Sequence, residues 1–142
     1  MVIEESVLIR ATLQKVWETF ADITCWNDWN NVLRNVSPGR PKVLSEGSRL
    51  RFCIHPFHFP VHLEPVVEEV VPEKRLVWYS RKFGVSARHA FVFEKTADGV
   101  KVTSRETFSG LPLGAFRPLF PTGRLRELTV TFLKELKGAA EA

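Results

Sequence analysis

Two groups of residues in this sequence could support chemistry, and the first is a set of three histidines. His55, His58 and His62 have a spacing that a metal site could use. A hairpin turn within 56–61 would pair His55 with His62 and Cys53 with Glu64. The opposite face would then be uniformly apolar, with Leu50, Phe52, Ile54, Leu63, Pro65 and Val67. We therefore expect the histidines to face outward, where a metal would lack buried partners for its ligands, and we predict no metal site.

The second group is an imidazole and a carboxylate on neighbouring predicted strands, His89 and Glu106. Asp98-Gly99 is the strongest turn signal in the chain and is typical of a two-residue type I′ hairpin. With this pair at the centre of the turn, the predicted cross-strand pairs are Phe93–Ser104, Phe91–Glu106 and His89–Phe108. These side chains share one face of the hairpin, which we expect to be the inner one.

A second turn, Phe83-Gly84, fixes the position of the preceding strand. Pairing Lys82 with Val85 gives the further pairs Ser80–Ala87, Trp78–His89 and Leu76–Phe91. The two turns together predict a row of Trp78, His89 and Phe108 across three strands, with Glu106 diagonal to His89. A neighbouring carboxylate favours the charged form of His89 and burial opposes it, so the direction of its pKa shift stays open.

The elements that must position these residues begin with a strand over 4–10 and two short helical segments. Thr12 is a suitable N-cap for the first helix, whose apolar residues Leu13, Val16, Trp17 and Phe20 recur at helical spacing. The second segment, 22–29, carries Trp26 and Trp29. After it, the chain has strand patterns as far as Gly110.

One helix is predicted at the end of the chain. Three prolines between Leu111 and Pro121 argue against an earlier start, so we expect the helix to begin near Thr122 and to end at Lys137, with Gly138 as its stop. Its apolar stripe consists of Leu125, Leu128, Phe132 and Leu136. The preceding segment, 111–120, is expected to cover the mouth of a cavity.

The order of these elements resembles the START-like superfamily. The residues that carry the resemblance are IRATLQKVWETFADITCWNDWN, EEVVPEKRLVWYS and DGVKVTSRETFSG. Within the superfamily, the chain is most similar to the bacterial polyketide cyclase/dehydrase-type proteins, often called SRPBCC and related to Bet v 1. The resemblance implies an α+β helix-grip fold, in which a curved antiparallel sheet wraps around a long C-terminal helix and two short helices follow the first strand. It also implies an apolar cavity between sheet and helix.

The composition agrees with a single compact domain, and the resemblance implies one START-like domain over residues 1–142. Eleven Phe and four Trp suit a sheet that lines a pocket, although a plain aromatic core would use them equally well. The net charge of +4 comes from dispersed Lys and Arg residues that form no run, which argues against a nucleic-acid partner.

The remaining sequence signals concern location and redox state. The N-terminus is acidic and lacks an apolar signal region, and no apolar run approaches membrane-spanning length. We therefore expect a cytoplasmic protein with no stable membrane insertion. Cys25 and Cys53 have neither metal nor redox spacing, so reduced thiols are expected.

Three functions are compatible with these features. The first is binding of a small hydrophobic or aromatic molecule, lipid- or polyketide-like, in an internal cavity. The predicted lining is Trp26, Trp29, Phe52, Ile54, Leu63, Trp78, His89, Phe91, Phe93, Ser104, Glu106, Phe108, Leu113 and Phe116. The second, which the resemblance allows, is an aromatase/cyclase or dehydratase with His89 and Glu106 as acid and base. The third is a protein-interaction module.

Binding is favoured over catalysis because nothing in the sequence requires a reaction. There is no nucleophile elbow and no phosphate-binding loop, and no catalytic triad can be placed. No cofactor is expected. The expected partner is a small hydrophobic ligand, and the chain is expected to be a monomer or a homodimer.

Overall fold

The computed structural model describes residues 1–38 and 44–142, without the side chains of Pro38 and Phe116. The strands are β1 (Val2–Ile9), β2 (Arg34–Pro38), β3 (Leu50–Ile54), β4 (Val61–Leu63), β5 (Val66–Val71), β6 (Arg75–Lys82), β7 (Val85–Thr96) and β8 (Gly99–Ser109). The helices are α1 (Leu13–Ala21), α2 (Trp26–Trp29), α3 (Leu111–Phe116) and α4 (Thr122–Glu141), with short 3₁₀ turns η1 (Ile23–Cys25) and η2 (Arg117–Leu119). Among the described helices, none has both the length and the apolar character needed to cross a membrane.

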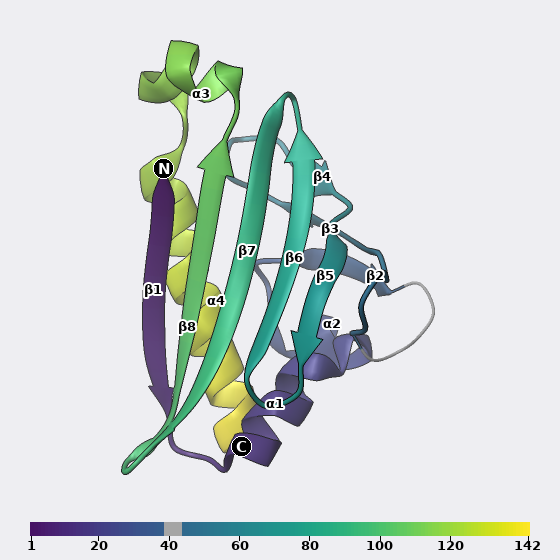
Figure 1. Cartoon of the computed structure of the whole chain (residues 1–142), viewed down its shortest axis with the longest axis vertical. Helices are drawn as coiled ribbons and strands as arrows, with labels where there is room; N and C mark the ends of the chain where they lie inside the picture. Colours follow the sequence, from purple (N-terminus) through teal and green to yellow (C-terminus); the bar gives the residue numbers. More distant parts are fainter. Residues whose placement is uncertain (39–43) are drawn as a thin grey trace.

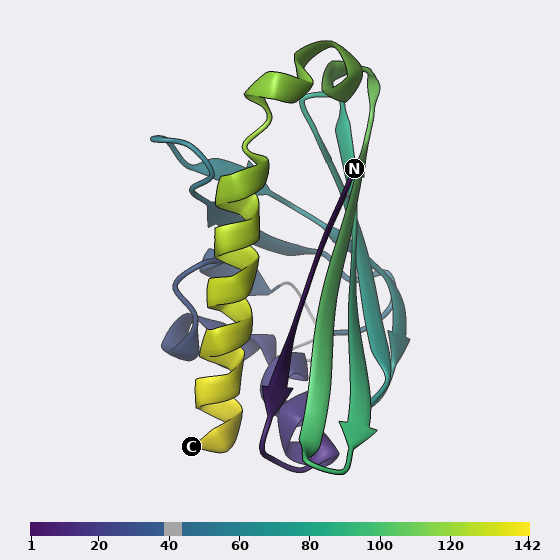
Figure 2. The same ribbon diagram turned by 90° about the vertical axis from the view of Figure 1, so that its left-hand side faces the viewer.

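The strands form two antiparallel sheets that a long helix crosses. The larger sheet has the order β1-β8-β7-β6-β5, and the smaller one has the order β2-β3-β4. An isolated bridge between Arg49 and Val66 connects the two. Helix α4 runs along the face of the larger sheet, and α1 and α2 lie at one end of it (Figures 1 and 2). This arrangement confirms the predicted helix-grip fold.

Helices α1 and α2 fill one end of the space between sheet and α4. Thr12 caps α1 as predicted, and its hydroxyl accepts a hydrogen bond from the Lys15 N–H at 3.1 Å. Phe20 is fully buried on the inner face of α1. Trp26 is fully buried too, and its indole N–H donates to the Phe20 carbonyl at 2.8 Å. This end of the molecule is therefore a packed aromatic core.

Helix α4 begins where the sequence predicts but does not end there. Leu125, Phe132 and Leu136 are buried, as expected for its apolar stripe. The predicted stop at Gly138 is wrong, because the helix continues to Glu141. The extra turn buries Ala140 and lets the Glu141 carboxylate accept a hydrogen bond from the Arg10 backbone N–H at 2.7 Å. These tertiary contacts outweigh the modest cost of a glycine inside a helix.

The predicted register of the β7–β8 hairpin is wrong by two residues. Thr96 pairs with Gly99, so Ala97 and Asp98 form the turn, and not Asp98 and Gly99. Gly99 has a φ of +147°, and a Cβ atom there would overlap the backbone carbonyl oxygen of Ile9. The glycine therefore permits a close approach to the end of β1 rather than a type I′ turn. Because strand side chains alternate with a period of two, the shift leaves the inner face unchanged.

The other two hairpins give one confirmation and one correction. Lys82 pairs with Val85 as predicted, and both Phe83 and Gly84 have the positive φ that a type I′ turn requires. In the β3–β4 hairpin, however, His62 pairs with Cys53, and the predicted His55–His62 pair does not form. Ile54 pairs with Val61, so the loop covers 55–60 and the register differs from the predicted one by two residues. Pro56, two residues after the end of β3, and Pro60 lack the N–H group that a further ladder hydrogen bond would need.

We predict that Gly99→Ala destabilises the fold by at least about 2 kcal/mol, because the new methyl group must displace the Ile9 backbone. Gly138→Ala is the matched control. It lies inside α4 with open space around it, so the same change should stabilise the protein by about 0.5–1 kcal/mol. Urea unfolding of both variants measures the two effects. Equal stability of Gly99→Ala and the parent protein would contradict the described approach of the two backbones.

Candidate functional site

The inner face of the larger sheet changes from large to small side chains along the strands. Three neighbouring rows across β6, β7 and β8 are Leu76–Phe91–Ser104, Trp78–His89–Glu106 and Ser80–Ala87–Phe108. The predicted row of Trp78, His89 and Phe108 is therefore wrong in its last member, and Glu106 lies directly opposite His89. Beyond this row, Ser80 and Ala87 are too small to reach α4, which leaves room for a hollow.

His89, Glu106 and Ser104 form a polar cluster in this apolar face. The His89 Nε2 and Ser104 Oγ atoms lie 2.6 Å apart and share a hydrogen bond whose direction depends on the imidazole tautomer. On the other side of the ring, Nδ1 lies 3.6 Å from a Glu106 carboxylate oxygen. The side chains of His89 and Glu106 are only 14% and 19% exposed, and Ser104 is 1% exposed.

Aromatic rings hold the His89 imidazole in place. The ring stacks on Phe91 with centroids 4.2 Å apart, and the edge of Trp78 meets it at 5.4 Å. These contacts leave the imidazole little rotational freedom. The orientation that results points Nε2 at Ser104 and Nδ1 towards Glu106.

Burial changes the ionisation of both titratable groups. Removal from water disfavours either charged form, so it lowers the pKa of His89 to about 3 and raises the pKa of Glu106 to about 7. At neutral pH the imidazole is therefore uncharged, and the Glu106 carboxyl is close to half ionised. A carboxyl in this state can donate or accept a hydrogen bond, and it can act as an acid or a base.

Two hollows meet at this cluster. The inner one, of about 60 Å³, is bounded by Trp78, His89, Phe91 and Ser104 on the sheet and by Leu128 and Phe132 on α4. The outer one, of about 260 Å³, extends towards Phe57, Phe83 and Phe120. Both are lined by Ile54, Leu63, Ser80, Glu106 and Leu125. The Glu106 carboxyl therefore stands where a narrow inner space joins a wider apolar one.

Nine of the residues proposed from the sequence line these two hollows. They are Phe52, Ile54, Leu63, Trp78, His89, Phe91, Ser104, Glu106 and Phe108. Leu113 borders an adjoining hollow of about 130 Å³. The side chain of Phe116 lies outside the described part of the structure.

Trp26, Trp29 and Phe93 line none of the described hollows. Trp26 and Phe93 pack against Phe20 in the aromatic core, with ring centroids 5.4 and 5.2 Å away. Trp29 lies behind the Phe132 ring at 5.4 Å. The two tryptophans therefore do not border the wide hollow, which lies towards the other end of α4, beside residues of the 111–120 segment.

Sequence reasoning missed the small residues that create the space. The predicted hairpin puts Ser80 and Ala87 on the inner face, but the predicted lining does not include them. Their small size on an otherwise bulky face was the available signal. The three histidines of the β3–β4 hairpin do not converge, and within residues 1–38 and 44–142 no three His, Cys, Asp or Glu side chains are placed to hold a metal ion.

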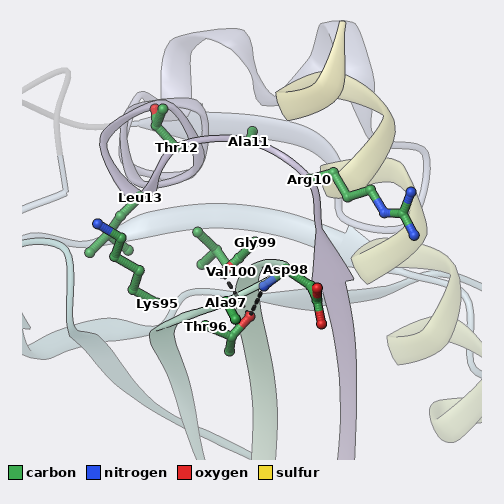
Figure 3. Close-up of a pocket in the computed structure, with 10 residues that line it drawn as sticks. All are labelled: Arg10, Ala11, Thr12, Leu13, Lys95, Thr96, Ala97, Asp98, Gly99 and Val100. Atoms are coloured by element: carbon green, nitrogen blue, oxygen red, sulfur yellow. Dashed lines mark hydrogen bonds between the residues drawn. The ribbon is translucent and has the colours of Figure 1, made fainter.

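The largest of the described hollows, of about 610 Å³, lies elsewhere, between residues 10–13 and the β7–β8 turn (Figure 3). The Thr96 hydroxyl there donates to the Gly99 carbonyl at 2.9 Å and accepts from the Asp98 N–H at 3.3 Å. Its charged side chains, Arg10, Lys95 and Asp98, are exposed to water. This hollow is a surface depression around a turn, so the His89 cluster is the stronger candidate site.

The fold and the lined hollow define a START-like helix-grip protein of the SRPBCC, Bet v 1-like type. Residues 1–141 match the family described as polyketide cyclase/dehydrase and lipid transport, and the chain belongs to this family. The resemblance inferred from the sequence is thus confirmed. A search of curated proteins finds no match.

Solved structures with the same fold cover nearly the whole chain. TTHA0849 from Thermus thermophilus is 16% identical with a TM-score of 0.82, and the match covers 99% of this chain and 97% of that one. The hypothetical protein jhp0584 from Helicobacter pylori is 21% identical with a TM-score of 0.79, over 99% and 88%. The di-domain ARO/CYC StfQ from the steffimycin biosynthetic pathway is 13% identical with a TM-score of 0.79, over 99% and 52%.

We predict that the raised pKa of Glu106 makes stability depend on pH. A carboxyl with a higher pKa in the folded state holds its proton more tightly there than in the unfolded chain. Its contribution to the free energy of unfolding is therefore complete below pH 4.5 and is lost as the pH rises to about 7. Glu106→Gln mimics the neutral form and removes this dependence. The unfolding free energy of the parent protein should therefore fall by about 3 kcal/mol relative to the variant over this range.

Urea unfolding of both proteins at about pH 4 and about pH 8 measures this difference, in which the contribution of His89 cancels. Glu94→Gln, an exposed carboxylate on β7, is the control and should follow the parent protein at both pH values. Parallel pH profiles of the parent protein and Glu106→Gln would contradict the described burial.

Proposed function

We propose that residues 1–142 act as a single domain that binds a small, flat, largely apolar molecule carrying one hydroxyl or carbonyl group. The observation that carries this proposal is the His89–Glu106–Ser104 cluster at the junction of two apolar hollows. Ligand sites commonly combine apolar walls with a few convergent polar groups, and the two volumes together reach the lower end of the usual range, ~300 Å³.

The walls of the hollows favour an aromatic or fused-ring ligand. Phe108 and Phe120 lie 5.1 Å apart on one side of the outer space, and Trp78 borders the inner one. Flat rings gain edge and stacking contacts with such side chains beyond the gain from buried area.

The polar cluster favours a ligand with a single oxygen near its inner end. An uncharged His89 and a Glu106 carboxyl near half ionisation can supply both a donor and an acceptor. A ligand oxygen would supply hydrogen bonds that the buried Glu106 carboxyl does not receive from neighbouring side chains. A hydroxyl or carbonyl is therefore preferred over a charged group, which would be costly to bury here.

Filling the hollow should abolish binding without disturbing the fold. Ala87 lines the outer hollow, whereas Ala90 lies on the opposite face of the same strand. We predict that Ala87→Leu lowers the affinity for 2-naphthol by at least about tenfold, because the added carbons occupy the ligand space. Ala90→Leu should keep the affinity within about twofold of the parent protein. Quenching of tryptophan fluorescence on titration measures both.

Two results would count against the proposal. One is the absence of saturable quenching by any member of a panel of flat apolar alcohols and ketones. The other is an equal loss of affinity in Ala87→Leu and Ala90→Leu, since that would locate the binding outside the hollow. Thermal unfolding of both variants checks that each is folded.

A second candidate function is acid–base catalysis on a polyketide-like substrate, as in an aromatase/cyclase or dehydratase. The observation that favours it is the pKa of Glu106, about 7, which suits a general base at neutral pH. The fold is shared with an ARO/CYC protein, although a likeness at 13% identity concerns the fold alone. The carboxylate would take a proton from a carbon next to a carbonyl, and the electron pair of that bond would move to the carbonyl oxygen to form an enolate.

Exchange of such a proton for deuterium tests this candidate directly. With acetoacetyl-N-acetylcysteamine, a β-ketothioester, in D₂O, we expect NMR to show an exchange rate above that of the buffer, rising with pH around pH 7. Glu106→Gln should lower the catalysed rate by about 100-fold or more, and Glu94→Gln should not. Exchange at the buffer rate would exclude catalysis of this step and leave the binding proposal standing.

A further inference from the structure

Large apolar side chains are exposed at the end of the molecule where the outer hollow lies. They come from the β3–β4 loop (Phe57, 44% exposed, and Phe59, 56%), the β6–β7 turn (Phe83, 77%) and the α3–η2 segment (Leu111, 92%, and Leu119, 75%). The β6–β7 turn and the α3–η2 segment occupy the same end of the ribbon in both views (Figures 1 and 2). Phe57 and Phe83 also line the outer hollow, as do Pro112 and Phe120. We call this surface the mouth rim.

Phe83 is the most informative residue of the mouth rim. It has a φ of +52° at the tip of the β6–β7 hairpin, a conformation that glycine or asparagine adopts easily and a bulky aromatic residue does not. Its ring gains little from packing, because it is mostly exposed. The chain therefore keeps a strained and unburied aromatic side chain at a projecting turn, which points to a role in contact with something outside the molecule.

The charge of the mouth rim is of one sign. The three segments that form it, 55–61, 80–87 and 110–122, contain Arg81, Lys82 and Arg117 but no Asp or Glu. The Lys82 ammonium group lies 5.4 Å from the centre of the Phe83 ring, so a cation and an exposed aromatic ring occur together at the tip. Glu106 lies inside the outer hollow, and the surface carboxylates of Glu64 and Glu127 near these segments pair with Arg51 and Arg124.

The opposite end of the molecule lacks this character. The β5–β6 and β7–β8 turns carry Glu73 and Asp98, and no large apolar side chain projects from either turn among the described residues. Within residues 1–38 and 44–142, exposed aromatic rings and cations without nearby surface carboxylates therefore occur together at the end with the outer hollow. Net charge alone would not produce such an asymmetry.

We propose that the mouth rim docks onto the surface of a bilayer that contains anionic phospholipids. Exposed apolar side chains can enter the headgroup region, and Arg and Lys beside them are attracted to negatively charged lipids. A second copy of this chain is a poorer occupant, because a symmetric contact through the mouth rim would bring Arg81, Lys82 and Arg117 of one copy close to the same cations of the other.

Docking in this way would turn the outer hollow towards the acyl chains of the bilayer. The inference does not depend on the identity of a bound molecule, since the exposed side chains and the charge would act in the same way if the hollow stayed empty. Docking and the proposed binding of a small apolar molecule can therefore fail separately.

Vesicle flotation tests the proposal with the whole chain. We expect the protein to float with vesicles of phosphatidylcholine and phosphatidylglycerol but not with phosphatidylcholine alone. Floating should cease at about 1 M salt, where charges are screened beyond about 3 Å. Absence of flotation with the anionic vesicles, or equal flotation with neutral ones, would overturn the proposal.

Two variants locate the contact. Phe83→Asn should lower the partition onto anionic vesicles by about tenfold. It should leave the melting temperature equal or higher, because asparagine fits the positive φ better. Lys82→Ser should lower partition by about fivefold. Lys95→Ser, which removes the same charge at the far end of the sheet, should change it by less than about twofold.

Equal losses in Lys82→Ser and Lys95→Ser would mean that the whole charge of the protein drives the attraction, and the mouth rim would not be the docking surface. A concentration-dependent dimer that Phe83→Asn dissolves, seen by sedimentation without vesicles, would assign the surface to a second copy instead. Either result would overturn the proposal.

Discussion

The cost of burying an imidazole and a carboxyl in an aromatic sheet is the constraint on which the site depends. Burying either group costs more free energy than burying a hydrocarbon side chain of similar size. The pKa of each group is shifted from its ordinary value in the direction that removes the charge. The protein limits this cost with one hydrogen bond between His89 and Ser104 and with ring contacts from Phe91 and Trp78 to His89. The hollow beside Glu106 leaves its carboxyl oxygens accessible, so they can form hydrogen bonds with a molecule that enters the hollow.

The same sheet separates packing from function along its length. At one end, Phe20, Trp26 and Phe93 interlock with α4 and supply a dense core. At the other end, Ser80 and Ala87 leave a hollow, and a separate small cluster of Ile3, Phe108, Leu113 and Leu125 packs β1, β8, α3 and α4 together beside it. Stability can therefore come from one half of the molecule while the other half stays open.

The sequence predicted on which face of the sheet a side chain lies better than it predicted which residues pair across neighbouring strands. Alternation along a strand depends only on the pleat, so the prediction that His89, Glu106 and Ser104 share the inner face holds although their pairing was wrong by two residues. The exact pairing depends on Gly99, whose role is set by the distant Ile9 backbone and cannot be deduced from the turn itself. The end of α4 was missed for a similar reason, since the partner of Glu141 lies at Arg10.

The alternation of side chains along the strands also limits how proteins of this fold can change during evolution. Moving a two-residue turn along the chain by one residue slides one strand past the other by two residues, yet every inner side chain stays inside. Adding or removing a single residue at a turn of fixed size would instead exchange the faces of one strand and expose part of the core. Substitutions that move the β7–β8 turn by one position would therefore give Glu106 a different neighbour on β7 while the inner face keeps its residues. The position of the turn is thus a means of changing the surroundings of Glu106 without rebuilding the sheet.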